Sequence, residues 1–124
     1  MEKIKILLVE DDKFLSEMYA TKLTESGFEV ETAFDGEEGL VKVKDLKPKL
    51  VLLDIVLPKK DGFEVMAELK EKGFLRESKV IALTNLGQKE EVEKGMSLGA
   101  SDYIIKAHFT PTEVVAKVKK ILGI

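Results

Sequence analysis

The stretch LVLLD, residues 50–54, decides the fold, because four consecutive apolar residues run directly into a carboxylate. An apolar run without alternation is typical of a strand buried on both faces of a parallel sheet. Other short β-rich segments recur along the chain, and the five expected strands cover residues 4–9, 28–33, 50–53, 80–83 and 102–105. The sequence therefore predicts a parallel sheet covered by helices.

The segments between these strands carry apolar residues at helical spacing. Four of the expected helix faces consist of Leu15, Met18, Tyr19 and Leu23; Leu40, Val43 and Leu46; Phe63, Met66 and Leu69; and Val114, Val118, Ile121 and Leu122. Strands joined by helical crossovers lie parallel, with right-handed connections and helices on both faces. We expect an α/β fold: a three-layer, doubly wound, five-stranded parallel sheet of flavodoxin-like order 2-1-3-4-5 with five helices.

Helix start and stop signals support these boundaries. Gly27 and Gly99 stand shortly before expected strands, where a left-handed C-cap usually ends a helix. Residues 110–113, TPTE, combine a capping threonine, a proline suited to the first helical position and a glutamate that can close a capping box. Asp35 and Asp61 are expected to cap their helices as well.

The composition excludes several classes of protein. With 124 residues, 44% of them apolar and 35% charged, the chain has the size of one globular domain and no apolar run that would span a membrane. We expect one soluble domain over residues 1–124, in the cytoplasm and without a membrane partner. The absence of cysteine and the single histidine leave oxygen atoms to hold any metal. A net charge of -3 gives no footprint for DNA, so direct nucleic-acid binding by this segment is not expected.

Reactive polar groups follow four of the five expected strands. Glu10 and Asp11 follow the first strand, Asp54 the third, Thr84 the fourth and Lys106 the fifth. Function gathers at the carboxyl ends of the strands in doubly wound sheets, so placing the first strand beside the third brings three carboxylates together. Clustered carboxylates raise one another's pKa unless a cation lies between them.

A hard divalent cation fits this cluster best. Mg²⁺ takes oxygen ligands, commonly one or two carboxylates with waters and a phosphate oxygen, and Mn²⁺ is the alternative. Together with the Lys106 ammonium and the Thr84 hydroxyl, such an ion would stabilise a phosphoryl group in transfer. Asp54 would be the nucleophile, and an ionised aspartate needs no general base. The expected product is an acyl phosphate that water later hydrolyses.

Each of these side chains also has an ordinary structural role when it is considered alone. Residues 10–12 would form a turn and capping cluster, with Asp12 as the cap of the first helix. Thr84 would be a turn hydroxyl and Lys106 a solvated charge. Asp54 is harder to explain, since a carboxylate that ends the most apolar strand is costly to bury without a partner. The combination of compatible groups favours a functional site.

Four motifs resemble those of response-regulator receiver domains. These are LLVEDD at residues 7–12, LLDIVLP at 52–58 followed by Asp61-Gly62, ALT at 82–84 and GASDYIIK at 99–106. The resemblance extends from Lys5 to about Leu122 and implies a phosphorylation-dependent switch of a two-component phosphorelay. It also implies a signalling protein rather than an enzyme, one that catalyses only its own phosphorylation and dephosphorylation.

The resemblance implies a role for each site residue. Asp54 would be the phosphoacceptor, Asp11 a direct ligand of Mg²⁺, Glu10 a metal-site acid acting through water, and Val56 a backbone carbonyl ligand. Thr84 and Lys106 would contact the phosphoryl group. Tyr103 would change rotamer with the phosphorylation state, although it also suits ordinary strand packing.

The implied partners are a phosphohistidine donor and a receiver of the signal. The donor would be a sensor histidine kinase or a histidine phosphotransfer protein, and the signal would pass to a downstream protein or to an output domain outside this chain. The surface of the fourth helix, fifth strand and fifth helix is the expected output. Gly87 and Gly95 are expected to weaken the fourth helix, whose segment 88–98 should shift easily.

The sequence departs from the family pattern after two of the motifs. Ala107 stands where a proline usually follows the lysine and its preceding peptide bond is usually cis. A cis bond before a residue other than proline costs about 2.5–4 kcal/mol, so Lys106–Ala107 is expected to be trans and the next loop slightly rearranged. Asn85 is larger than the usual small residue and is expected to alter access to Asp54.

The same residues argue against three other functions. A flavodoxin-like FMN carrier would offer hydroxyls and backbone donors to a phosphate, whereas residues 10–12, EDD, repel one. A haloacid-dehalogenase-like phosphatase normally needs a second aspartate two positions after the nucleophile, where this chain has Val56. A degenerate receiver that only binds partners would not need Asp54, Thr84 and Lys106 together with the acidic pair.

Overall fold

A computed structural model describes residues 2–85 and 88–124. The strands are β1 Lys5–Val9, β2 Glu29–Ala33, β3 Leu50–Asp54, β4 Lys79–Thr84 and β5 Asp102–Ile105. The helices are α1 Lys13–Glu25, α2 Gly36–Leu46, α3 Gly62–Glu71, α4 Lys89–Ser97 and α5 Pro111–Leu122, with short 3₁₀ turns η1 Phe74–Arg76 and η2 Lys106–His108. The expected strands are all present, with ends that differ by one residue at most.

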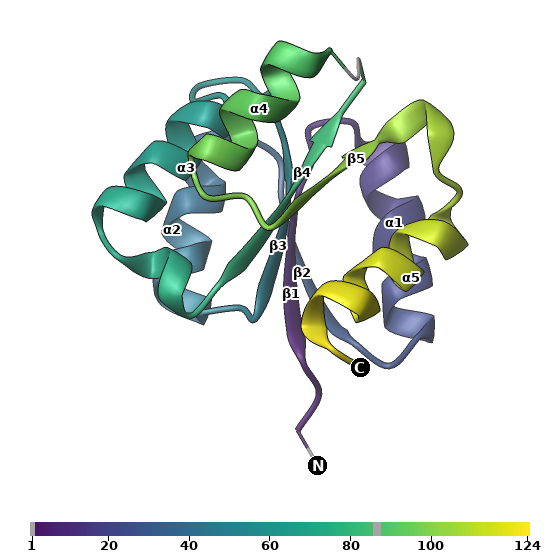
Figure 1. Cartoon of the computed structure of the whole chain (residues 1–124). Coiled ribbons are helices and arrows are strands. Elements are labelled where there is room, and N and C mark those ends of the chain that lie inside the picture. Colours follow the sequence, from purple (N-terminus) through teal and green to yellow (C-terminus); the bar gives the residue numbers. More distant parts are fainter. Residues whose placement is uncertain (1, 86–87) are drawn as a thin grey trace.

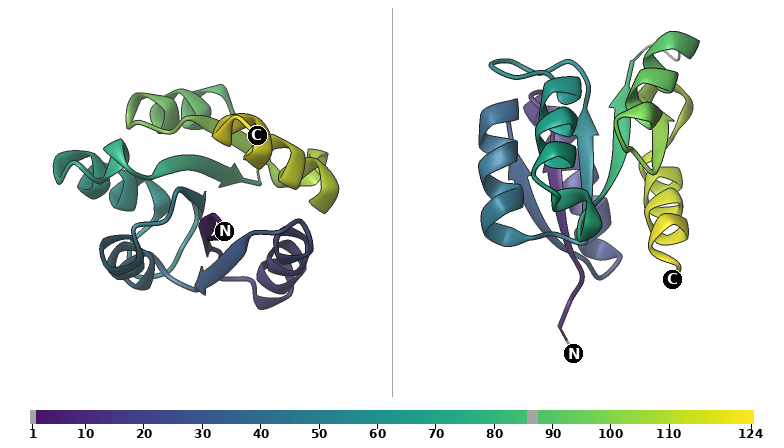
Figure 2. Two further views of the ribbon diagram at one scale, coloured as in Figure 1. Left: turned by 90° about the horizontal axis from the view of Figure 1, so that it is seen from below. Right: turned by 60° about the vertical axis from the view of Figure 1, so that its left-hand side comes forward.

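The strands form one parallel sheet in the order β2-β1-β3-β4-β5, which confirms the expected fold. Helices α2, α3 and α4 cover one face of the sheet and α1 and α5 the other (Figure 1), and the left view of Figure 2 shows the sheet between these two layers. No helix among the described residues is long and apolar enough to cross a membrane.

The two faces of the central strands build two separate cores. In β1, Leu7 and Val9 pack with the buried side chains of α2 and α3, whereas Ile6 and Leu8 pack with those of α1 and α5. Strand β3 is buried along its whole length, because apolar side chains leave it on both faces. This burial fixes the carboxyl ends of β1 and β3 side by side.

The helix ends follow the expected caps. Asp12, Asp35 and Asp61 accept hydrogen bonds from the backbone of their first turns, and Asp61 closes a capping box with Glu64. Thr110 does the same with Glu113 at the start of α5. Gly27 and Gly99 have φ values of +98° and +108°, as expected for residues that end a helix.

The expected trans peptide at Lys106–Ala107 is confirmed, since the described residues contain no cis peptide bond. Residues Lys106–His108 form the 3₁₀ turn η2 directly after β5. The chain therefore leaves the sheet through a tight turn that begins at Lys106.

Helix α4 contains one of the two glycines that are expected to weaken it. Gly87 lies outside the described residues, whereas Gly95 is buried in the last turn of α4. A methyl group on Gly95 would meet Met66 Cε at 3.7 Å and Ala82 Cβ at 3.9 Å, which are ordinary contacts. The space beside Gly95 therefore accepts an alanine.

We predict that Gly95→Ala raises the free energy of unfolding by about 0.5–1 kcal/mol, because alanine costs less backbone entropy in a helix. Urea denaturation followed by circular dichroism measures the change. Gly99→Ala is the control, since a Cβ there would lie 2.5 Å from Leu75 Cδ1 at a positive φ, and it should destabilise. A less stable Gly95→Ala would contradict the packing described for α4.

Candidate metal centre

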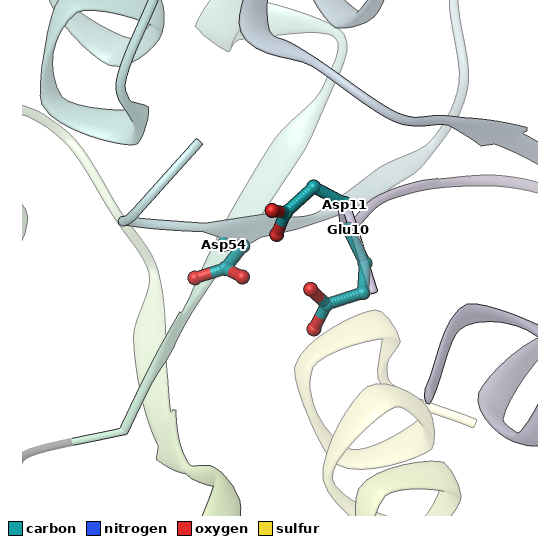
Figure 3. A group of neighbouring side chains, drawn as sticks. All are labelled: Glu10, Asp11 and Asp54. Carbon is teal, nitrogen blue, oxygen red and sulfur yellow. The ribbon is translucent and has the colours of Figure 1, made fainter. Parts of the chain in front are cut away.

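Three carboxylates meet where β1 and β3 end. Glu10 and Asp11 directly follow β1, and Asp54 is the last residue of β3. One carboxylate oxygen from each residue lies within 4.8 Å of the others. Figure 3 shows the three side chains gathered at the ends of these neighbouring strands. The sequence prediction that these residues come together is confirmed.

Burial makes this cluster unusual. Glu10 is 1% exposed and Asp54 is 3% exposed, whereas Asp11 is exposed. Two carboxylates that are buried side by side repel each other and lose their hydration. The site therefore needs a positive charge.

Lys106 supplies one such charge from the end of β5. Its Nζ donates to Glu10 Oε1 at 2.5 Å and to Asp54 Oδ2 at 2.7 Å, and its side chain is only 8% exposed. Burial acts to lower the pKa of Lys106, but the hydrogen bonds to Asp54 and Glu10 outweigh it and raise that pKa. Lys106 is therefore held charged between the two buried carboxylates.

Glu10 keeps a raised pKa in spite of this lysine. Burial is the main cause of the rise, the neighbouring Asp54 adds to it, and Lys106 opposes it. One lysine thus leaves the negative charge of the cluster only partly compensated. A divalent cation beside the same carboxylates would complete the compensation.

The loop after β3 holds Asp54 in place. The Val56 N–H donates to Asp54 Oδ1 at 3.1 Å, while the Val56 side chain points to solvent. The cluster opens into a cleft of about 350 Å³ lined by Asp12, Val56, Asn85 and Lys106 as well as the carboxylates. Val56 and Asn85 therefore both border the access route to Asp54.

Gly62 is a site residue whose role the sequence did not reveal. A Cβ at this position would lie 2.4 Å from the backbone oxygen of Asp54 and 2.8 Å from Ile55 Cα. The start of α3 therefore touches the backbone of Asp54 directly, and Gly62 N–H donates to the Ile55 carbonyl at 2.8 Å. The sequence signal was only that a glycine follows the capping Asp61.

Thr84 and Tyr103 do not line this cleft; they lie close to α4. Thr84 is the buried last residue of β4, next to Leu83, which pairs with Asp54 in the sheet register. Tyr103 in β5 is partly exposed. Both border a small, largely apolar cavity of about 10 Å³ beneath α4. The expected contact of Thr84 with a phosphoryl group and the expected rotamer change of Tyr103 both stay predictions.

The Thr84 hydroxyl has a partner that the sequence did not suggest. It donates to Glu91 Oε2, in the first turn of α4, at 3.4 Å. From the sequence alone, Glu91 reads as one of the acidic residues that favour a helix N-terminus. Only the folded chain brings it to the end of β4.

The strand order and the acidic cleft at the carboxyl edge of the sheet define a class, the doubly wound α/β domains with clustered carboxylates at the ends of their strands. Within this class, residues 6–119 match the model of the response regulator receiver domain. The chain belongs to this family, and it is a signalling domain rather than a conventional enzyme.

Curated relatives support this assignment. The chain is 41% identical over 118 residues to the alkaline phosphatase synthesis transcriptional regulatory protein PhoP of Bacillus subtilis, covering 95% of this chain and 48% of the relative. It is 36% identical, with the same coverage, to the DNA-binding dual master transcriptional regulator RpaA of Synechocystis. The chain spans about half the length of the curated relatives it matches.

Solved structures show the same fold. The receiver domain of the Francisella response regulator 1452 superposes with a TM-score of 0.89 at 28% identity, covering 96% of both chains. The BeF₃-activated DrrB receiver domain superposes with a TM-score of 0.84 at 35% identity, covering 99% of this chain and 100% of that chain. CheY in the CheX–CheY–BeF₃–Mg²⁺ complex of Borrelia burgdorferi gives 0.88 at 30%, covering 96% and 89%.

Proposed function

We propose that Asp54 accepts a phosphoryl group from a phosphohistidine donor in the presence of Mg²⁺, and that this phosphorylation shifts the surface formed by α4, β5 and α5. The observation that carries the proposal is the contact of Lys106 with both buried carboxylates, next to the exposed Asp11. Two structural neighbours hold BeF₃, one of them together with Mg²⁺, and this supports the proposal by analogy.

The donor set fits a hard divalent cation. Its members are the carboxylates of Glu10, Asp11 and Asp54, with the backbone carbonyl of Val56 as a further oxygen. Mg²⁺ prefers such oxygen ligands, and Mn²⁺ shares the preference closely enough to replace it. When bound, the ion supplies positive charge beside the phosphoryl oxygens.

The residues of this chain account for the transfer step. Asp54 is positioned by the Val56 N–H and by Lys106, and one of its carboxylate oxygens attacks phosphorus. The bond from phosphorus to the donor nitrogen breaks, and its electron pair leaves with the imidazole. Lys106 and Thr84 are then available to donate hydrogen bonds to the phosphoryl oxygens. Water attacks phosphorus in the later hydrolysis and releases inorganic phosphate, which restores the carboxylate.

The partners follow from this chemistry. The donor is a sensor histidine kinase or a histidine phosphotransfer protein. The curated relatives are transcriptional regulators about twice as long as this chain, so the signal passes either to a separate protein or to a domain outside residues 1–124. Residues 1–124 act as one receiver domain, and this segment is not expected to bind DNA itself because its net charge is -3.

Removal of the metal tests the proposal. We predict that acetyl phosphate with Mg²⁺ adds one phosphoryl group to the protein, and that a chelator slows the reaction by about a hundredfold or more. Intact mass spectrometry measures the adduct, and added Mn²⁺ should restore it. An equal adduct with and without the chelator would overturn the metal role, and no adduct under any condition would overturn the phosphoacceptor role.

A further inference from the structure

Glu91 joins the end of β4 to the first turn of α4. The Thr84 hydroxyl donates to Glu91 Oε2 at 3.4 Å, and Thr84 is buried while Glu91 is half-buried. This distance is longer than the usual 2.5–3.0 Å of such a bond, so the contact is of modest strength. A contact of this kind holds a helix in place but can be broken by a stronger competitor.

Among the described residues, few other contacts attach helix α4 at this end. Its N-cap residue Gln88 makes no side-chain capping hydrogen bond, unlike the capping aspartates of α1, α2 and α3. Within α4, whose residues are all described, Gly95 is the only buried one. The cavity of about 10 Å³ beneath the helix is bordered by Thr84, Glu91 and Tyr103. The polar contact at Glu91 is therefore one of the contacts that hold the first turn, together with the half-buried Val92 that lines the same cavity.

A phosphoryl group on Asp54 would act on this contact in two ways. Thr84 is the neighbour in β4 of Leu83, whose Cα pairs with that of Asp54, and its hydroxyl has a single hydrogen to donate. A phosphoryl group carries nearly two negative charges and three strong acceptor oxygens. It therefore competes with Glu91 for the Thr84 hydroxyl, and it repels the Glu91 carboxylate.

We propose that Glu91 is a latch residue: its carboxylate holds the first turn of α4 against β4 through Thr84 in the unphosphorylated domain, and phosphorylation of Asp54 releases it. This inference rests on the proposed phosphorylation of Asp54. It assigns the release of α4 to a repulsive charge on the helix itself, in addition to the attraction of Thr84 toward the phosphoryl group.

The test compares Glu91→Ala with Glu90→Ala, which changes an exposed glutamate of the same first turn. Both variants lose the same charge at the same helix end. Hydrogen exchange of α4 is measured before phosphorylation, and Glu91→Ala should speed it by about fivefold relative to wild type. In Glu90→Ala the exchange rate of α4 should stay within about twofold of the wild-type rate. Equal exchange in the two variants would overturn the latch.

Two further variants separate the hydroxyl from the charge. Thr84→Val should also speed the exchange of α4, and the double variant should speed it by less than the two single effects combined, because both changes remove the Thr84–Glu91 contact. Additive effects would contradict a shared contact. Glu91→Gln keeps an acceptor but loses the repelling charge, so its exchange before phosphorylation should match wild type.

The same samples are then treated with acetyl phosphate and Mg²⁺ and checked by intact mass. Phosphorylation should increase exchange in α4 of the wild type, and the increase should be at least about twofold smaller in Glu91→Gln, where the repulsion is absent. An equal increase of α4 exchange in wild type and Glu91→Gln would overturn the proposed repulsion between the phosphoryl group and Glu91. If the wild type takes up no phosphoryl group, the proposed function fails, whereas the exchange of the untreated variants still decides whether Glu91 holds α4.

Discussion

Asp54→Asn is expected to abolish phosphoryl uptake from acetyl phosphate in the presence of Mg²⁺. Asparagine keeps the shape of the side chain and an oxygen that can accept from the Val56 N–H, so the loop after β3 should stay in place. It removes the nucleophilic oxygen and the negative charge that faces Lys106. Intact mass spectrometry should show no adduct on the variant under conditions that label the wild type.

A matched control keeps this result specific. Asp61→Asn also converts an aspartate in the same loop region to asparagine, and asparagine caps a helix about as well as aspartate. Asp61→Asn should therefore take up a phosphoryl group like the wild type. An adduct of wild-type size on Asp54→Asn, or its loss in both variants, would show that another residue is modified or that the loop has collapsed.

Lys106→Met is expected to lower the free energy of unfolding by about 3 kcal/mol in the absence of divalent metal. The change leaves Glu10 and Asp54 buried without their shared counter-charge, and an uncompensated buried charge is one of the costliest defects in a protein interior. Mg²⁺ should recover part of the loss, since a ligand that binds only the folded state stabilises it. Urea denaturation with and without Mg²⁺ measures both effects.

Lowering the pH should reduce the stability that Lys106→Met loses relative to wild type. The pKa of Glu10 already lies above its ordinary value of 4.5, and loss of Lys106 removes the group that opposes this rise. A carboxyl with a raised folded pKa binds its proton more readily when folded, so its contribution to stability grows as the pH falls toward 4.5. The free energies of unfolding of wild type and Lys106→Met should therefore lie closer together in acid.

Lys117→Met is the control for the lysine. Lys117 pairs with Asp102 at 2.9 Å, but both side chains are 22% exposed and far less buried than Lys106. Its loss should cost about 1 kcal/mol or less, with no rescue by Mg²⁺. Equal losses in the two variants, or no rescue of Lys106→Met, would contradict the role of Lys106 as the counter-charge of a metal centre.

Local sequence patterns were enough to predict the fold and the acidic cluster. The unbroken apolar run before Asp54 required a strand buried on both faces, and burial on both faces required the helical layers. Parallel strands place their carboxyl ends at one edge, so Glu10, Asp54 and Lys106 had to come together there. Caps such as Asp61 and Thr110 were predictable because they act within a single helix turn.

Contacts between elements were beyond this reasoning. The approach of Gly62 to the Asp54 backbone depends on how α3 docks, and no local pattern encodes that distance. The Thr84–Glu91 contact depends on the placement of α4 relative to β4, which is set by packing over a small cavity. Side-chain partners across two elements need the folded geometry, whereas strand ends and caps do not.

Gly62 gives the domain an uneven stiffness. On the α3 side, backbone touches backbone at Asp54, leaving no room for even one methyl group. On the α4 side, a small cavity lies between the helix and the sheet, and the polar contact that joins them is modest. We expect a structural change at Asp54 to be resisted by the tightly packed α3 and to be accommodated by the loosely packed α4. We therefore expect α4 to move while α3 stays in place.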